Sequence, residues 1–102
     1  MKVVWTRPAL RHLAEAREFI AIDNPAAARR QIERIERIEL TVNRLKAFPM
    51  MGRAGIETGT REFPVPGTPY VVVYRVREEQ LRMLAVLHGA RFRRPHSEEI
   101  SE

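Results

Sequence analysis

The residues of this sequence that could take part in chemistry are mostly arginines. The chain has 102 residues, with 18 Lys and Arg against 13 Asp and Glu, and only Lys2 and Lys46 are lysines. The formal net charge is +5. Arginine forms planar, bidentate hydrogen bonds to phosphates and carboxylates, which lysine cannot imitate. The sequence therefore predicts an acidic partner, either nucleic acid or an anionic protein segment.

A histidine and several arginines fall on the predicted strands and just after them: Arg61, Arg75, Arg77, Arg82, His88, Arg91, Arg93 and Arg94. Histidine titrates near neutral pH, so it could transfer protons while guanidinium groups hold a phosphate. His88 with Arg61 and Arg91 is the candidate catalytic set of a ribonuclease. The alternative is that these arginines are solvated charges at the rim of a sheet and that His88 ends a strand.

Other site chemistries are excluded by the pattern. The chain has no cysteine, so disulfides, thiolate metal sites and cysteine nucleophiles are ruled out. Its three histidines lack the spacing of metal ligands, and we expect no metal or cofactor. The serines, Ser97 and Ser101, lie in no nucleophile elbow. There is no membrane-length apolar run and no signal-peptide pattern, which predicts a cytoplasmic protein without a membrane partner.

Two helices should position these residues. Residues 2–6 are mostly β-branched or aromatic and predict a short strand. Thr6 is the expected N-cap of a helix over about 8–22, and Asn24 that of a second helix over about 25–46. The short connection between them predicts a helical hairpin. The expected buried stripes follow helical spacing, with Leu10, Leu13, Ala16 and Ile20 on the first helix and Ala28, Ile32, Ile35, Ile38 or Glu39, Val42 and Leu45 on the second.

Three strands are expected after the helices, over 61–65, 70–77 and 81–88. Strict alternation in the last strand would place Leu81, Met83, Ala85 and Leu87 on one face and Arg82, Leu84, Val86 and His88 on the other. The order β-α-α-β-β-β predicts an α+β fold, an antiparallel sheet with the N-terminal helical hairpin packed on one face. We expect one domain over 1–95 and an acidic, frayed tail over 96–102.

Six short motifs follow one another in an order that is similar to the toxins of the RelE/ParE superfamily. They are Val-Val-Trp-Thr-x-x-Ala (3–9), Asn-Pro-x-Ala-Ala (24–28), Phe-Pro-x-Met-Gly-Arg-x-Gly (48–55), Gly-Thr-Arg-Glu-Phe (59–63), Tyr-x-x-x-Tyr-Arg-Val (70–76) and Leu-His-Gly-Ala-Arg (87–91). The family's fold has the order predicted above. The resemblance implies the toxin of a type II toxin–antitoxin pair, neutralised by a small cognate antitoxin. An acidic, partly disordered antitoxin segment would wrap the basic toxin.

The superfamily has two activities. RelE-like members cleave messenger RNA on the ribosome, whereas ParE-like members are associated with poisoning DNA gyrase. The ribonuclease branch typically has lysines on the strand at 61–65 and an arginine after the first tyrosine of the next strand. This sequence has no lysine there, and Val71 follows Tyr70. These departures favour the ParE-like branch, with Arg91, Arg93 and Arg94 as candidate target-binding residues.

Two alternatives stay open. A RelE-like ribonuclease would use His88, Arg61 and Arg91. A stand-alone nucleic-acid-binding module would use the same arginines for phosphates, although the sequence has neither the interleaved aromatics of an RNA platform nor a helix-turn-helix pattern.

Overall fold

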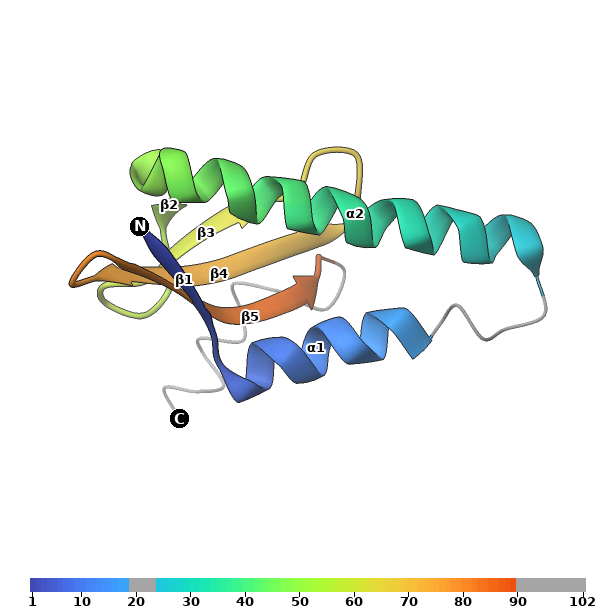
Figure 1. Ribbon diagram of the computed structural model, residues 1–102, viewed down its shortest axis with the longest axis horizontal. Helices are drawn as coiled ribbons and strands as arrows, with labels where there is room; N and C mark the ends of the chain where they lie inside the picture. Colours follow the sequence, from blue (N-terminus) through green and yellow to red (C-terminus); the bar gives the residue numbers. More distant parts are fainter. Residues whose placement is uncertain (19–23, 90–102) are drawn as a thin grey trace.

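The computed structural model describes residues 1–18 and 24–89 and contains two helices beside a five-stranded sheet (Figure 1). The elements are β1 (Lys2–Trp5), α1 (Arg7–Glu18), α2 (Pro25–Ala47), the 3-10 helix η2 (Pro49–Met51), β2 (Arg53–Ala54), β3 (Arg61–Pro64), β4 (Tyr70–Arg77) and β5 (Gln80–His88). The strand order is β1-β5-β4-β3-β2, in which β1 is parallel to β5 and the other neighbours are antiparallel. The predicted α+β class is confirmed. The sheet also contains a short edge strand, β2, that the sequence analysis does not predict.

Both helices begin at the predicted capping residues. An amide in the first turn of α1 donates to Thr6 Oγ1 at 3.4 Å. Two amides in the first turn of α2 donate to Asn24 Oδ1 at 3.0 and 3.2 Å, so that the side chain satisfies donors that no helical carbonyl could reach. The predicted end of the first helix near residue 22 lies outside the described residues, as does the tail over 96–102.

One hydrophobic core joins both helices to the sheet. Its members are buried and come from α1, α2 and the strands β4 and β5, with Val65 between β3 and β4: Ala9, Leu13, Ala16, Ile35, Ile38, Val42, Leu45, Val65, Tyr70, Val72, Tyr74, Leu81, Met83 and Val86. Figure 1 shows both helices running alongside the strands, with α2 above and α1 below them in that view. Both helices therefore pack on the same face of the sheet, against β4 and β5.

The predicted stripes are wrong at one position in each helix. Leu10 is 50% exposed and Ile32 is 44% exposed. On α2 the buried side chains step back from Ile38 to Ile35 and then to Gln31 rather than Ile32. A helix turns about 100° per residue, so the residue after Gln31 faces away from the sheet. Ile20, also placed on a stripe, lies outside the described residues.

A β-bulge in β5 overturns the predicted alternation of that strand. Val73 pairs with Ala85 and Tyr74 pairs with Met83, which leaves Leu84 without a partner on β4. The extra residue reverses the side on which every later side chain of β5 lies. His88 therefore shares a sheet face with Tyr70, to which it pairs, and not with Arg82.

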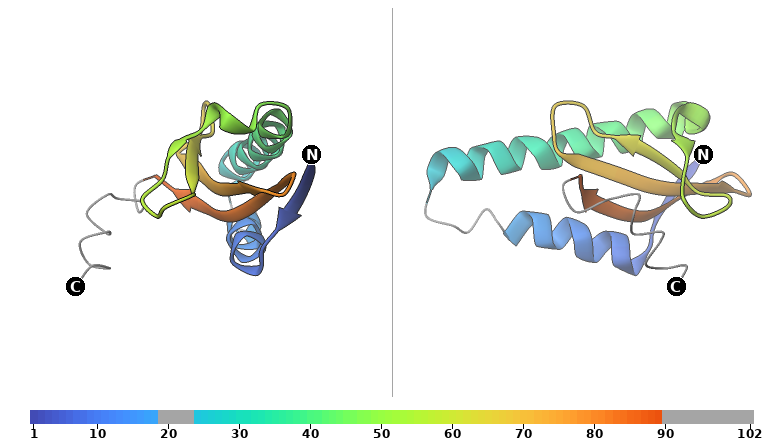
Figure 2. Two further views of the ribbon diagram at one scale, coloured as in Figure 1. Left: turned by 90° about the vertical axis from the view of Figure 1, so that its left-hand side faces the viewer. Right: turned by 180° about the vertical axis from the view of Figure 1, so that it is seen from behind.

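The helix α1 covers the part of β5 that β1 does not reach. β1 pairs with β5 up to Met83, and the hydroxyl of Thr6 donates to the Met83 carbonyl at 2.7 Å where α1 begins. Further along α1, His12 Nδ1 accepts the backbone N–H of Val86 at 3.1 Å. Both views of Figure 2 show α1 lying next to β5. The helix thus supplies an acceptor for a backbone N–H of β5 on the side away from β4, where the pairing with β1 has already ended.

Candidate functional site

The candidate histidine lies at the end of β5, against the tyrosine that begins β4. The rings of His88 and Tyr70 meet edge to face, with centroids 5.6 Å apart at 72°. The hydroxyl of Tyr70 accepts a hydrogen bond from Gln31 Nε2 at 2.8 Å, and the same amide donates to the carbonyl of Ala16 at 3.0 Å. Gln31 is buried and connects α1, α2 and β4 through this one group. His88 is therefore packed on a structural network.

The candidate cation Arg61 lies at the other end of β4. Its Nη1 donates to the carbonyl of Gly52 at 2.6 Å, and the backbone N–H of Gly52 donates to the hydroxyl of Tyr74 at 2.9 Å. That hydroxyl donates in turn to the carbonyl of Pro49 at 2.7 Å. Burial raises the pKa of Tyr74 above its usual 10.0, although the Gly52 hydrogen bond and the charge of Arg61 act against that rise. Arg61 and Tyr74 thus hold the segment that follows α2 onto the sheet.

The sheet register separates His88 from Arg61. His88 pairs with Tyr70, whereas Arg61 pairs with Tyr74 on the far side of β4. Four residues of strand and two strand spacings correspond to about 13 Å along the sheet and about 10 Å across it. The two side chains thus start far apart on the sheet, and that of Arg61 is bound to the Gly52 carbonyl. The third member of the predicted set, Arg91, lies outside the described residues, as do Arg93 and Arg94.

Three further arginines share the opposite face of the sheet. Arg75 and Arg82 are directly paired across β4 and β5, and Arg77 lies two positions further along β4. Like charges placed directly opposite each other repel and cost stability. Arg75 folds back toward the turn before β3, where its Nη2 donates to the carbonyl of Thr58 at 3.4 Å and its Nε is buried with no partner among the described residues. The sequence groups these arginines with His88, but the bulge places them on the other face.

Among the described residues, four buried polar side chains are absent from the sequence prediction, and two of them, Gln31 and Glu62, hold elements together. Gln31 could have been found by extending the spacing of Ile38 and Ile35 one step toward the N-terminus of α2, although its polarity argues against burial. Glu62 on β3 is 1% exposed and forms an ion pair with Arg53 Nε on β2 at 3.2 Å. No local pattern distinguishes Glu62 from an exposed strand residue, because its burial depends on neighbouring strands.

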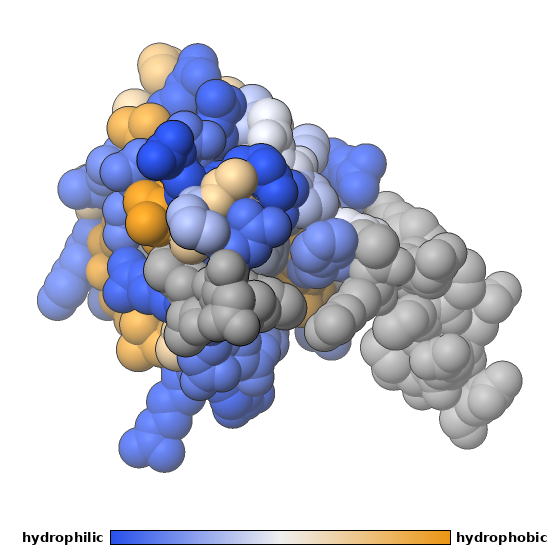
Figure 3. Space-filling model, turned by 90° about the vertical axis from the view of Figure 1, so that its right-hand side faces the viewer, coloured by the Kyte–Doolittle hydropathy of each residue, from blue (hydrophilic) through white to orange (hydrophobic). Residues whose placement is uncertain are grey.

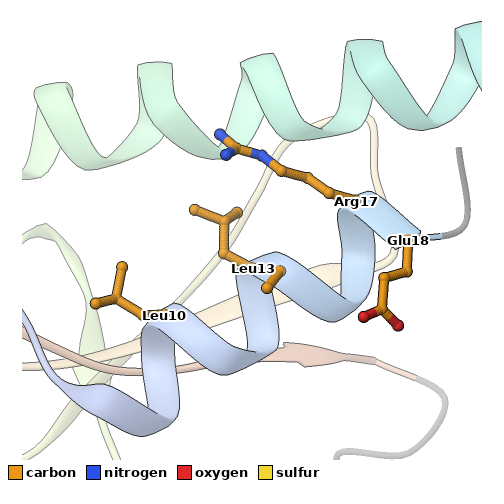
Figure 4. Close-up of a pocket in the computed structure, with 5 residues that line it drawn as sticks. Leu10, Leu13, Arg17 and Glu18 are labelled. Atoms are coloured by element: carbon orange, nitrogen blue, oxygen red, sulfur yellow. The ribbon is translucent and has the colours of Figure 1, made fainter.

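A shallow groove follows the side of α1 that faces α2. One part is lined by Leu10, Leu13, Arg17 and Glu18, and Figure 4 shows Leu10, Leu13 and Arg17 directed toward α2. Arg17 Nη2 forms an ion pair with Glu39 of α2 at 3.3 Å. An adjoining part is lined by residues of β1 and α2, among them Trp5 and Lys46. Both positive and negative side chains line this groove, so it favours neither sign of charge.

A second groove lies on the outer face of α2, away from α1. It has a volume of about 480 Å³ and is lined mainly by Leu40, Ala47, Phe48 and Pro66, with Arg37 and Arg44 beside them. Leu40 and Phe48 are 63% and 64% exposed. By contrast, the end of the molecule where α2 begins is mostly hydrophilic, with hydrophobic patches toward one side (Figure 3). We call this second groove the Leu40–Phe48 groove.

Neither metal binding nor membrane insertion has support in the described part of the chain. Across residues 1–18 and 24–89, no three His, Asp or Glu side chains come together as metal ligands would. Neither described helix combines the length and apolar character that a membrane crossing requires.

A small α+β domain with two N-terminal helices, a mostly antiparallel sheet and an arginine-rich surface has the architecture of the RelE/ParE superfamily toxins. Residues 3–92 match the family model described as the ParE toxin of the type II toxin–antitoxin system parDE. The chain therefore belongs to the ParE toxin family and is the toxin component of a type II toxin–antitoxin system, whose partner is a cognate antitoxin.

Relatives and solved structures agree with this assignment. Protein Y4kP of Sinorhizobium fredii, which is named as a toxin, is 36% identical over 88 residues, 86% of this chain and 88% of its own. Toxin RelE2 of Caulobacter vibrioides is 32% identical over 90 residues, 88% of this chain and 97% of its own.

The fold is also found in two solved structures. A chain from the chromosomal ParDE system of P. aeruginosa has a TM-score of 0.72 at 21% identity and covers 86% of this chain and 95% of that one. The isolated E. coli RelE toxin has a TM-score of 0.60 at 10% identity and covers 98% of this chain and 95% of that one.

Proposed function

We propose that this toxin arrests growth by binding DNA gyrase and blocking replication, and that it does not cleave RNA. The observation that carries the proposal is the separation of His88 from Arg61 by the sheet register. In-line cleavage of RNA needs a base for the 2′-hydroxyl, a cation on the phosphate and an acid for the leaving oxygen, all at one site. Membership of the ParE family supports the same target class.

The surroundings of the two candidate residues point the same way. The guanidinium of Arg61 is bound to the Gly52 carbonyl at 2.6 Å, which holds it on the segment after α2. His88 lies against the ring of Tyr70. β3 carries no lysine, and Val71 stands where a ribonuclease of this superfamily typically has an arginine. A toxin that acts through surface complementarity needs none of these groups.

The test compares the two targets in parallel. Toxin separated from its antitoxin is added to a supercoiling reaction of purified gyrase, relaxed plasmid and ATP, and to a cell-free translation reaction. We expect loss of supercoiling at toxin concentrations that leave translation and messenger RNA intact. His88→Gln should inhibit gyrase as strongly as the unchanged toxin, and the toxin bound to its antitoxin should inhibit neither reaction.

A ribonuclease is the second candidate, because RelE2 is among the relatives at 32% identity. Messenger RNA that is cut in the presence of the toxin, and is no longer cut with His88→Gln, would overturn the gyrase proposal. Unchanged supercoiling at toxin concentrations far above those that arrest cells would overturn it as well.

A further inference from the structure

We propose that the Leu40–Phe48 groove is the docking site for an acidic, amphipathic segment of the cognate antitoxin. The segment would place an apolar side chain against Leu40 and Phe48 and its carboxylates against Arg37 and Arg44. The proposal rests on membership of a toxin–antitoxin family and is independent of the gyrase target.

The apolar lining of the groove lies on a face of α2 that the toxin's own core does not use. The buried face carries Ile38 and Val42, whereas Leu40 and the residue after the helix, Phe48, are more than half exposed. Large apolar side chains gathered in a groove and left in water mark a surface that a partner covers. The groove volume of about 480 Å³ accommodates a few large side chains of a peptide segment.

The charges beside the groove specify an acidic partner. Arg37 and Arg44 are seven positions apart on α2, with Leu40 between them, so the two guanidiniums stem from points about 10 Å apart along the helix. Among the described residues, neither forms an ion pair. An extended segment spans that distance in about three residues and a helical one in about seven. Carboxylates at either spacing could pair with both arginines while an apolar residue between them enters the groove.

Arg37 is already oriented for this role. Its Nη1 donates to the carbonyl of Pro66 at 3.3 Å, and the guanidinium lies over Gly67, where a Cβ atom would come within 2.5 Å of it. A guanidinium has five N–H donors, so one backbone contact leaves donors for a carboxylate. A cation fixed before binding loses less conformational freedom when the partner arrives.

The same charges argue against other occupants. A symmetric dimer through this groove would bring Arg37 and Arg44 of one copy against those of the other, and like charges facing each other disfavour association. The groove along α1 lacks this selectivity, because Arg17 there is paired with Glu39. An acidic segment thus fits the Leu40–Phe48 groove better than either a second copy of this chain or the α1 groove.

The experiment uses three toxin variants made together with the antitoxin. Leu40→Asp places a carboxylate in the groove, and Arg44→Glu reverses a charge beside it. Ile32→Asp is the matched control, because Ile32 is an exposed aliphatic residue of the same helix outside the groove. Antitoxin affinity is measured by titration calorimetry, and toxicity is measured by growth with and without antitoxin expression.

We expect Leu40→Asp to weaken antitoxin binding by about 100-fold and Arg44→Glu by about 10-fold, with Ile32→Asp within about 2-fold of the unchanged toxin. Leu40→Asp and Arg44→Glu should still arrest growth, and the antitoxin should no longer rescue the cells. Replacing an antitoxin carboxylate with lysine should restore the binding of Arg44→Glu. Arg44 is exposed, so this variant keeps the test decisive if Leu40→Asp fails to fold.

Three results would overturn the proposal. Equal antitoxin affinity for Arg44→Glu and Ile32→Asp would show that the groove is not the docking site. Loss of toxicity in a folded variant that still binds antitoxin would assign the groove to the toxin's target. Conversion of a dimer into a monomer with unchanged antitoxin affinity would assign it to a second copy. Supercoiling inhibition is measured without antitoxin, so failure of the gyrase proposal leaves this test unaffected.

Discussion

Tyr70, which begins β4, and Tyr74, four residues further toward its other end, are the same residue type in the same orientation but are secured in different ways. Tyr70 and Tyr74 are both buried on the face that contacts the core. The hydroxyl of Tyr74 forms hydrogen bonds with two backbone groups, the N–H of Gly52 and the carbonyl of Pro49. Arg61 also binds this segment, through the carbonyl of Gly52. The hydroxyl of Tyr70 bonds to a side chain, that of Gln31.

This difference indicates which of the two tyrosines tolerates substitution of its hydrogen-bond partner. Backbone partners cannot be exchanged by substitution, so the Tyr74 end depends on a fixed geometry in which glycine leaves the room for the ring. A side-chain partner can be replaced, and the Tyr70 end depends on one amide that also reaches α1. We therefore expect changes at the Tyr74 end to cost more stability than changes at the Tyr70 end.

Gly52→Ala should have the largest effect. A Cβ atom at this position would overlap the hydroxyl of Tyr74 and lie 2.9 Å from its ring and 3.0 Å from the carbonyl of Glu62. We expect a loss of about 3 kcal/mol in the free energy of unfolding, from overpacking and a strained hydrogen bond. Denaturant melts measure it. The loss should be smaller when Tyr74 is already phenylalanine, and an equal loss in both backgrounds would show that the hydroxyl is not the obstacle.

Tyr74→Phe alone should cost about 2 kcal/mol, because it leaves the Gly52 N–H and the Pro49 carbonyl without partners near the core. Thermal melts followed by circular dichroism provide the measurement. A loss below about 0.5 kcal/mol would mean that water replaces the hydroxyl at no cost, and that the two tyrosines are alike.

Gln31→Leu should cost about 1–1.5 kcal/mol, less than the changes at Tyr74, since the lost bonds are partly offset by an apolar side chain in a buried position. Arg34→Ala is the control, because Arg34 Nη1 meets the amide oxygen of Gln31 at 3.4 Å from a more exposed position. Denaturant melts of both variants should rank Gln31→Leu well above Arg34→Ala. The opposite ranking would contradict the role of the amide.

Alkaline pH should weaken the fold through Tyr74. Its pKa is raised in the folded state, so above the ordinary value of 10.0 the unfolded chain loses this proton first. Stability should therefore be intact below pH 10.0 and fall as the pH rises through the folded pKa, with a slope of at most about 1.4 kcal/mol per pH unit from this group. Melts across pH 9–11.5 measure it, and Tyr74→Phe should have a flatter profile than the unchanged protein.

His88→Gln should have the smallest effect, on toxicity. His88 packs on Tyr70, far from Arg61, and we expect growth arrest within about 2-fold of the unchanged toxin, because amide and imidazole both suit a strand end. Growth curves at matched expression levels provide the measurement. A toxin inactivated by this change while still folded would contradict the gyrase proposal.

Much of the fold follows from local patterns in the sequence. The two capping residues mark the start of each helix, and the apolar runs of 70–77 and 81–88 give the long strands. These signals are local because capping and strand propensity depend on neighbouring residues.

The features that the sequence does not reveal depend on distant contacts. The bulge at Leu84 lies in an apolar run without glycine or proline, so nothing local indicates the change of face that brings His88 to Tyr70. Gln31 is buried because Ala16 and Tyr70, both remote in sequence, supply its hydrogen-bond partners. Strict alternation also groups His88 with Arg82, which the bulge places on opposite faces, whereas the candidate pair His88 and Arg61 is separated by the pairing register of three strands.

The parallel contact of β1 with β5 has a consequence for the synthesis of the protein. The hydroxyl of Thr6 reaches the carbonyl of Met83, a separation of 77 residues. At a translation rate of about 5–20 residues per second, the ribosome needs about 4–15 s between making these two partners. During that interval β1 and α1 have no β5 to pack on, and the core cannot close. The nascent toxin therefore stays incomplete until β5 has emerged, and an antitoxin that is already present can meet it as it folds.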